Sequence, residues 1–299
     1  MTGTGTQNDP FVIADWSDFI TAVGTSDAYV EFPKNLVSTT DTDVNPNKLY
    51  VDSNGVVQKN VQPSDLANLY ENTFEFDLNT IHPEAFTSTI QIKCASLKGN
   101  GATIKNISFD DCNGFTLGAN TVINGLNVKN FYFATSSGKT FINAGASNSY
   151  ISHLDYCMFS GRVDERTSSQ YGNFISTYYG QAHSCSFNLQ LANYARFRST
   201  SNRTSFDMYN CRLNLTGETS KTLDILATNC YISGDISASI VASGQYSVFD
   251  VECNAISGSG TLILANSDKC SSISGLTSVT SAQLKDAAYL SSIGFPIQT

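Results

Sequence analysis

The chain has 299 residues, and its 17 basic and 26 acidic side chains give a net charge of −9 at pH 7. Charged residues make up only 14% of the chain, against roughly 25% in an average soluble domain, yet the apolar share of 41% is enough for a core. The acidic balance disfavours a nucleic-acid binder, because it offers phosphates no basic field. No apolar run approaches the roughly 18 residues of a membrane span. The opening residues lack the basic start and apolar stretch of a secretory signal, so we expect a protein made in a cytoplasm.

Residues 1–33 are predicted to form an α/β cap of strand, helix and strand. Residues 10–13 read as a short strand, and Asp15 is suited to cap the helix that follows, which Gly24 would end. Residues 28–32 then read as a second strand. The apolar face expected for the helix consists of Trp16, Phe19, Ile20 and Val23. We expect the cap to cover one end of a larger apolar structure, with Trp16 as part of the plug.

Residues 34–87 read as an irregular insertion. A hairpin is predicted over 49–57 around the turn residues Asn54 and Gly55, and a short helix from about Ser64 to Tyr70. The segment 41–45 has oxygen-bearing side chains at alternate positions, a pattern that can hold calcium. Pro46 occupies the place where an EF-hand loop needs glycine, which argues against that match.

Residues 88–272 are organised by a repeat built around cysteine. A cysteine with a short alternation of polar and apolar residues recurs every 17–28 residues, at positions 157, 185, 211, 230, 253 and 270. The segments Ser-Cys-Ser-Phe-Asn-Leu at 184–189 and Asn-Cys-Arg-Leu-Asn-Leu at 210–215 show the pattern clearly. Strands that return at such spacing indicate a solenoid. The predicted fold is therefore all-β, a right-handed parallel β-helix with coils about 4.8 Å apart.

The eight cysteines follow from this architecture. Stacking at the same point of each coil would make them an internal ladder of small apolar side chains. Disulfides and a metal role remain alternatives, but no CxxC pair occurs, and the three histidines supply a mixed Cys/His site poorly. No metal site and no cofactor are expected.

Residues 273–299 form a predicted helical tail. One helix is expected from Thr280 to Gly294, and its apolar residues would wrap much of the circumference. Such a helix must dock on the end of the rod or on another chain. The residues expected to serve assembly are Leu284, Tyr289, Leu290, Ile293 and Phe295.

Two further groups of residues are candidates for catalytic or binding sites. The pair Asp110 and Asp111 resembles the double aspartate of polygalacturonases, but the other motifs of those enzymes do not occur, and adjacent residues of a strand point to opposite faces. No catalytic residue is assigned. Basic and aromatic residues between 162 and 212 form a possible glycan-binding or interface patch, with His153, Asp155 and His183 nearby in sequence. The patch comprises Arg162, Asp164, Arg166, Tyr178, Tyr179, Arg196, Arg198 and Arg203.

The chain resembles small pectin-lyase-like β-helix proteins of bacteriophage virions. The general resemblance rests on the strand–helix–strand cap and the Cys/Asn repeat, and the viral part on the two ends, Gly-Thr-Gly-Thr-Gln-Asn-Asp-Pro-Phe at 3–11 and the sequence at 282–296. It implies a non-enzymatic structural protein, a capsid decoration, head fibre or tail spike component, that forms homotrimers and contacts other virion proteins. The alternative is a β-helix that binds or depolymerises a bacterial surface polysaccharide.

Overall fold

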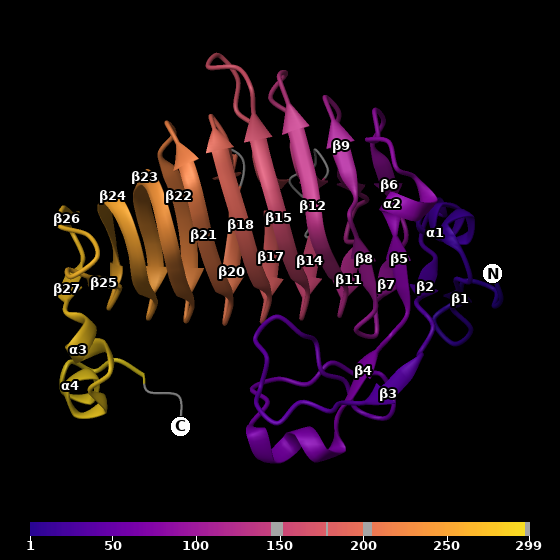
Figure 1. Cartoon of the computed structure of the whole chain (residues 1–299), viewed down its shortest axis with the longest axis horizontal. Helices are drawn as coiled ribbons and strands as arrows, with labels where there is room; N and C mark the ends of the chain where they lie inside the picture. Colours follow the sequence, from indigo (N-terminus) through magenta and orange to yellow (C-terminus); the bar gives the residue numbers. More distant parts are fainter. Residues whose placement is uncertain (145–151, 178, 200–204, 297–299) are drawn as a thin grey trace.

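The computed structural model describes residues 1–144, 152–177, 179–199 and 205–296. It is a rod of stacked β-coils with the N-terminus at one end and the C-terminal helices at the other (Figure 1). All strand pairings of the two large sheets are parallel in the described part of the chain, so the predicted parallel β-helix is confirmed. No helix of the described residues is long and apolar enough to cross a membrane.

The coils build two sheets. The large sheet comprises β1 (Phe11–Val12), β2 (Tyr29–Glu31), β5 (Glu75–Asp77), β7 (Ser96–Lys98), β8 (Thr103–Lys105), β9 (Ser108–Asp110), β11 (Val122–Asn124), β12 (Asn127–Thr135), β14 (Ser152–Asp155), β15 (Met158–Glu165), β17 (Tyr179–His183), β18 (Ser186–Asn193), β20 (Ser205–Tyr209), β21 (Arg212–Thr219), β22 (Leu223–Thr228), β23 (Tyr231–Gln245), β24 (Val248–Thr261), β25 (Leu264–Asn266), β26 (Ile273–Ser274) and β27 (Thr277–Val279). The second sheet comprises β6 (Ile90–Ile92), β10 (Phe115–Leu117), β13 (Thr140–Ala144), β16 (Asn173–Thr177) and β19 (Arg196–Arg198).

A sharp corner recurs in each coil and aligns the coils with one another. At each corner one residue has a left-handed backbone, and the residue after it points into the core and joins a column along the rod. The left-handed positions are Gly101, Gly125, Tyr156, Ser184, Asn210, Asn229, Tyr246 and Leu262. The column that follows them is Ala102, Leu126, Cys157, Cys185, Cys211, Cys230, Ser247 and Ile263.

Four of the eight cysteines form the predicted ladder within this column. The N–H of Cys157 donates to Sγ of Cys185 over 3.3 Å, and the N–H of Cys185 donates to Sγ of Cys211 over 3.4 Å. Cys211 and Cys230 repeat the contact at 3.3 Å, and Ser247 Oγ accepts the N–H of Cys230 at 3.1 Å. Each side chain thus satisfies a buried donor of the preceding coil.

The other four cysteines lie elsewhere, so the prediction of one ladder through all eight is wrong. For example, Cys253 pairs with Ile236 between β24 and β23, and Cys112 Sγ donates to the carbonyl of Phe86 at 3.3 Å. The reason is that the coil length changes along the chain, so a regular spacing of cysteines does not mark one point of the coil. All eight are free thiols.

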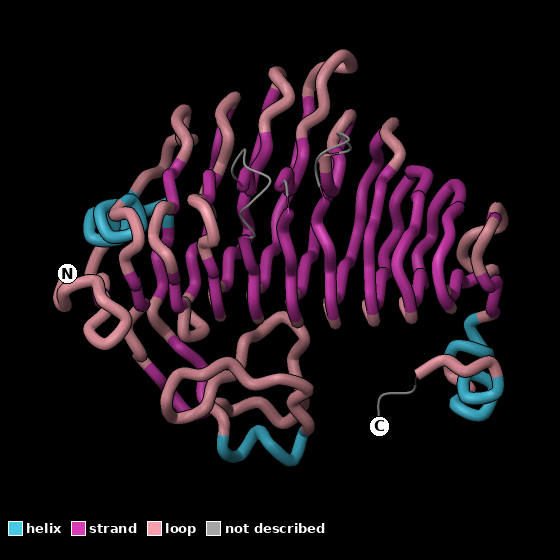
Figure 2. Tube along the Cα trace, turned by 180° about the vertical axis from the view of Figure 1, so that it is seen from behind, coloured by secondary structure: helices cyan, strands magenta, loops and turns pink. Residues whose placement is uncertain are grey.

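The coils shorten toward the C-terminus. Successive members of the ladder are separated by 28, 26, 19 and 17 residues from Cys157 to Ser247. The second sheet ends at β19, and the later coils run through the long strands β23 and β24 instead (Figure 2). The wider coils are filled by stacked rings, such as Phe141 on Phe174 at 5.7 Å and Phe174 on Phe197 at 5.9 Å between centroids.

The N-terminal cap has the predicted order of β1, α1 (Trp16–Gly24) and β2. Asp15 Oδ1 accepts the N–H of Asp18 at 2.8 Å and caps the helix. Phe19 and Val23 are buried, and Trp16 is half-buried against Phe19 and Phe76. Ile20, which we expected on the apolar face, is exposed, because the cap covers the rod with one narrow stripe of the helix only.

The segment 34–87 is a lobe of loops beside the rod (Figure 1). It contains the antiparallel pair β3 (Leu36–Ser38) and β4 (Tyr70–Asn72), the 3-10 helix η1 (Pro63–Asn68) and the short helix α2 (Leu78–Ile81). The predicted hairpin is reduced to a tight turn with a single bridge between Val51 and Val57. Strand β5 of this segment pairs with β8, so it already belongs to the rod.

The tail forms two short helices, α3 (Ser281–Leu284) and α4 (Ala287–Ser292), so the prediction of one helix is wrong. Asp286 interrupts the helix because its carboxylate accepts the N–H groups of Ala288 and Tyr289 and caps a new helix there. Neither helix contains a buried residue. The tail contacts the rod through Ser281, whose N–H donates to Asp268 Oδ2 at 2.7 Å.

Candidate functional site

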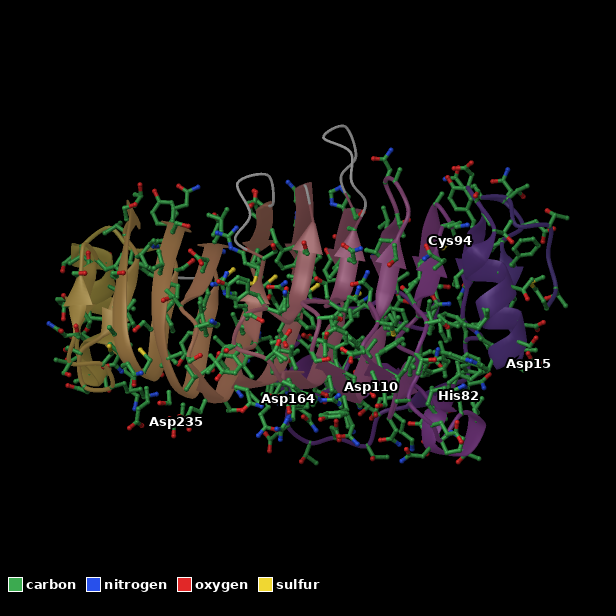
Figure 3. All side chains as sticks on the ribbon, turned by 90° about the horizontal axis from the view of Figure 1, so that it is seen from above. Asp15, His82, Cys94, Asp110, Asp164 and Asp235 are labelled. Carbon is green, nitrogen blue, oxygen red and sulfur yellow. The ribbon has the colours of Figure 1, made fainter. Side chains whose placement is uncertain are left out.

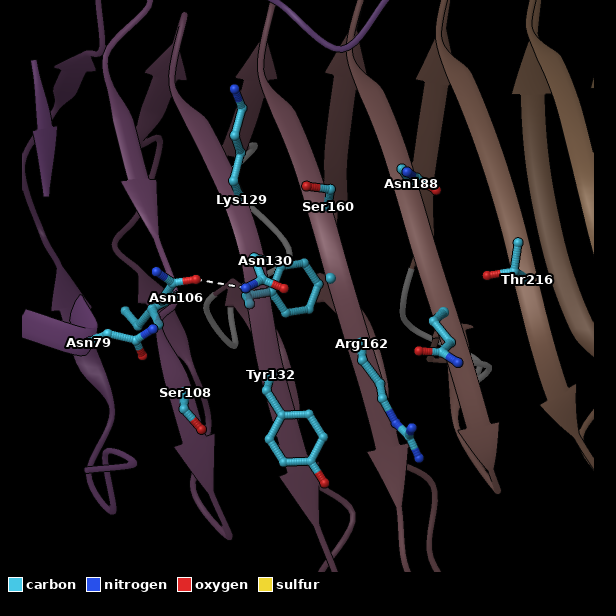
Figure 4. A pocket seen from close by; sticks show the side chains of 14 residues that line it. Asn79, Asn106, Ser108, Lys129, Asn130, Tyr132, Ser160, Arg162, Asn188 and Thr216 are labelled. Atoms are coloured by element: carbon cyan, nitrogen blue, oxygen red, sulfur yellow. Dashed lines mark hydrogen bonds between the residues drawn. The ribbon is translucent and has the colours of Figure 1, made fainter. Parts of the chain in front are cut away.

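An open hollow of about 760 Å³ lies across successive strands on one side of the rod (Figure 4). Most of the side chains that line it carry an amide or a hydroxyl group, and one tyrosine and two basic side chains lie among them. The fourteen lining residues are Asn79, Asn106, Ile107, Ser108, Lys129, Asn130, Phe131, Tyr132, Ser160, Gly161, Arg162, Asn188, Gln190 and Thr216.

The lining follows from the register of the strands. Tyr132 of β12 pairs with Ser108 of β9 on one side and with Arg162 of β15 on the other. Arg162 pairs in turn with Gln190 of β18, and Gln190 pairs with Thr216 of β21. Five outward-facing side chains therefore form one row over about 19 Å, at about 4.8 Å per strand.

A bend in the early coils gives the surface its concave shape. Lys129 and Asn130 of β12 together oppose the single residue Ser160 of β15, which is a β-bulge. Asn130 and Asn106 both have left-handed backbones, and Asn130 Nδ2 donates to Asn106 Oδ1 at 2.6 Å. Asn106 Nδ2 donates to Asp77 Oδ1 at 2.7 Å, so the bend is held by a chain of amides.

Gly161 forms part of the floor because no larger residue fits there. A Cβ atom at this position would lie 2.3 Å from the carbonyl oxygen of Phe131 and 2.5 Å from its ring. The neighbouring backbone cannot yield as a flexible side chain would. The buried Phe131 ring and the shape of the hollow therefore depend on glycine at 161.

The charges of the hollow are basic in the middle and acidic beyond its end. Burial lowers the pKa of Lys129 from its ordinary value. Arg162 Nη2 lies 2.9 Å from Oδ2 of the buried Asp164, whose other oxygen accepts Asn193 Nδ2 at 2.5 Å. Past Thr216 the same row continues with the exposed Asp235, and Figure 3 shows Asp110, Asp164 and Asp235 along one long side of the rod.

The described strand residues of the predicted basic and aromatic patch lie in two different sheets. Arg162 and Asp164 lie on β15 at the hollow, and Arg166 pairs with Asp110 at 2.9 Å. Arg196 and Arg198 lie on β19 in the second sheet. Residues close in sequence fall on different faces because the chain turns a corner between them. Tyr178 and Arg203 lie outside the described residues, as does the side chain of Tyr179.

The Arg196 guanidinium stacks over the ring of Tyr171 at 3.8 Å, and Lys221 Nζ lies 4.7 Å from the same ring. This cluster joins one loop to the rod. It is a structural contact between coils and lies away from the lining of the hollow.

The aspartate pair and the acidic loop of the insertion have structural roles. Asp110 pairs with Arg166, while Asp111 accepts the N–H and the hydroxyl of Ser136 at 2.6 and 2.7 Å, which lowers the pKa of Asp111. In the insertion, Asp41 binds the hydroxyl of Tyr50 and the amine of Lys48. Those partners occupy both carboxylate oxygens of Asp41.

Sequence reasoning missed most of the hollow. Its amides and hydroxyls, among them Asn188, Gln190 and Thr216, are ordinary strand residues in the sequence. A signal was present in the repeat itself, because these residues stand at alternate positions after successive cysteines.

Comparison of the chain with protein-family models, with curated proteins and with solved structures finds no match.

We predict that Gly161→Ala lowers the free energy of unfolding by about 1–3 kcal/mol, because the added methyl group overpacks the Phe131 contact. Chemical denaturation monitored by circular dichroism measures the change. Gly24→Ala is the matched control, since nothing lies within 4 Å of a Cβ there and stability should not fall. Equal stability of the wild type and Gly161→Ala would contradict the described packing.

Proposed function

We propose that this protein is a non-enzymatic β-helix that binds an extended polysaccharide in the hollow and forms part of the surface of a bacteriophage particle. The observation that carries the binding proposal is the hollow itself, a polar surface that crosses five strands and is open along its length.

The chemistry of the lining suits sugars better than other ligands. Amide and hydroxyl side chains donate and accept hydrogen bonds as sugar hydroxyls require, and the exposed ring of Tyr132 can stack on the apolar face of a pyranose. Most small-molecule sites are enclosed and largely apolar, unlike this one. The net charge of −9 opposes a nucleic-acid ligand.

Glycoside hydrolysis needs two carboxyl groups that flank the scissile bond. The lining residues in the described part of the chain include no Asp or Glu, and the neighbouring Asp164 is buried and bound to Arg162 and Asn193. This arrangement disfavours glycoside hydrolysis in the hollow.

The virion part of the proposal is supported by the resemblance at the two ends of the sequence and by the tail. The apolar residues Leu284, Tyr289, Leu290, Ile293 and Phe295 are only half-buried. Surfaces of this kind are completed by a partner. We propose that the tail joins copies of the chain, with a homotrimer favoured, or attaches them to other virion proteins.

Arg162→Ala and Tyr132→Ala should each weaken polysaccharide binding by about tenfold or more, since each removes a central contact. A panel of neutral and acidic bacterial polysaccharides, followed by titration calorimetry with the best ligand, measures the effect. Arg212→Ala and Tyr231→Ala are matched controls, because both residues are exposed and outside the lining. Unchanged binding by the hollow variants would contradict the site, and release of shorter chains would contradict the non-enzymatic assignment.

Removal of residues 280–299 should leave the rod folded, because β27 ends at Val279, but it should abolish oligomerisation or particle attachment. Light scattering gives the mass of the purified chain, and density-gradient fractionation with mass spectrometry follows it among particles. Ile20→Ser, which removes an exposed apolar residue at the opposite end, is the control. A wild-type chain that is monomeric and never sediments with particles would overturn this part of the proposal.

A further inference from the structure

Two histidines and a carboxylate gather on a surface that is separate from the hollow. His153 and Asp155 are two residues apart on β14 and therefore point to the same side. Asp155 pairs in register with His183 of β17 on the next coil. One ligand atom from each of the three residues lies within 4.8 Å of the others, and no other such group occurs in the described chain.

The separations are close to those of a metal site. Bonds of 2.0–2.2 Å from a tetrahedral ion place its ligands about 3.4 Å apart. Asp155 Oδ1 and His183 Nδ1 already lie 3.4 Å apart. The rings of His153 and His183 are edge to face with centroids 5.8 Å apart, and the ligand atoms of all three residues lie within 4.8 Å of one another.

The existing hydrogen bonds leave the ligand atom Asp155 Oδ1 available. Asp155 Oδ1 is shielded from solvent and makes no hydrogen bond, although His183 is beside it. A buried carboxylate oxygen without a partner is costly, and a cation would satisfy it. All three residues are half-buried, which leaves room for water in the remaining coordination position.

The corner of the coil holds two of the ligands in place. The thiol of Cys157 lies 3.3 Å from the backbone carbonyl oxygen of Asp155 and 3.4 Å from that of Ile123, and the thiol of Cys185 lies 3.5 Å from that of His183 and 3.1 Å from that of Leu154. The N–H of Tyr156 also donates to the carbonyl of His183, at 2.9 Å. The backbones of both ligands are thus fixed from within the core, which reduces the cost of ordering them around an ion.

The surroundings favour a cation as well. On the next coil, Asp207 and Tyr209 stand at the positions paired with Gln181 and His183. The ring of Tyr209 packs against that of His183 with centroids 5.2 Å apart. The carboxylate of Asp207 therefore lies one strand from His183 and two strands from His153, with Arg198 as its own basic neighbour.

We propose that His153, Asp155 and His183 bind one divalent transition-metal ion of the zinc class, with an open position toward solvent. Two imidazoles favour Zn²⁺, Ni²⁺ or Cu²⁺ over Ca²⁺ or Mg²⁺, which take oxygen ligands. The ion joins two successive coils from outside, opposite the cysteine ladder that joins them from inside.

The test is titration calorimetry of the EDTA-treated full chain with ZnCl₂ at neutral pH. We expect one ion per chain, and a loss of affinity of at least about tenfold in Asp155→Asn, His153→Gln and His183→Gln. Circular dichroism and thermal melting establish that each variant is folded.

His82→Gln is the matched control, since His82 is the third histidine of the chain and stacks on Phe86 at the N-terminal end. It should bind zinc as the wild type does. Absence of binding, or binding that the three cluster variants leave unchanged, would overturn the proposal. The visible spectrum of the Co²⁺ form distinguishes nitrogen and oxygen ligands from thiolates, and a thiolate spectrum would also overturn it.

Discussion

From Cys157 to Ser247, the alignment of successive coils is held by one hydrogen bond at each corner, from a buried N–H to the side chain of the coil that follows. A left-handed residue turns the chain inward at this point, and its turn leaves a backbone donor in the core. From Cys157 to Ser247, the sulfur or oxygen of the next coil accepts it. An unpaired donor in such a place costs about 1–3 kcal/mol, so coils in any other register are disfavoured.

This constraint positions both candidate sites. The outward residues of β12, β15, β18 and β21 form one row only because the corners before them are aligned, and the hollow is that row bent by the bulge at Lys129 and Asn130. The residues of the proposed metal site precede the same corners on β14 and β17, where the carbonyl oxygens of Asp155 and His183 lie 3.3 and 3.5 Å from the thiols of Cys157 and Cys185. Beyond Cys211 the coils are shorter and contain no strand of the second sheet, but each still has the corner. The rod therefore becomes narrower while its strands stay in register.

The architecture could be predicted from the sequence because some of the corners have a recognisable residue pattern. Asn210 and Asn229 tolerate the left-handed backbone, and a cysteine follows each. Tyr156, Tyr246 and Leu262 also have a left-handed backbone, but these residue types do not favour it, so the sequence does not indicate it. Whether residues of different coils meet depends on the exact coil length. The spacing of residues in the sequence therefore could not show that the described strand residues of the basic patch lie in two sheets, or that Asp155 lies beside His183.

The most direct measurement is amide hydrogen exchange at Cys185, whose N–H donates to Cys211 Sγ. In Cys211→Ala this amide should exchange faster by on the order of tenfold or more, while Cys211→Ser, which keeps an acceptor as Ser247 does, should protect it. Amides of the second sheet, such as that of Ile142, should keep their protection in both variants. Equal protection of the Cys185 amide in Cys211→Ala and in the wild type would contradict the role assigned to the corner.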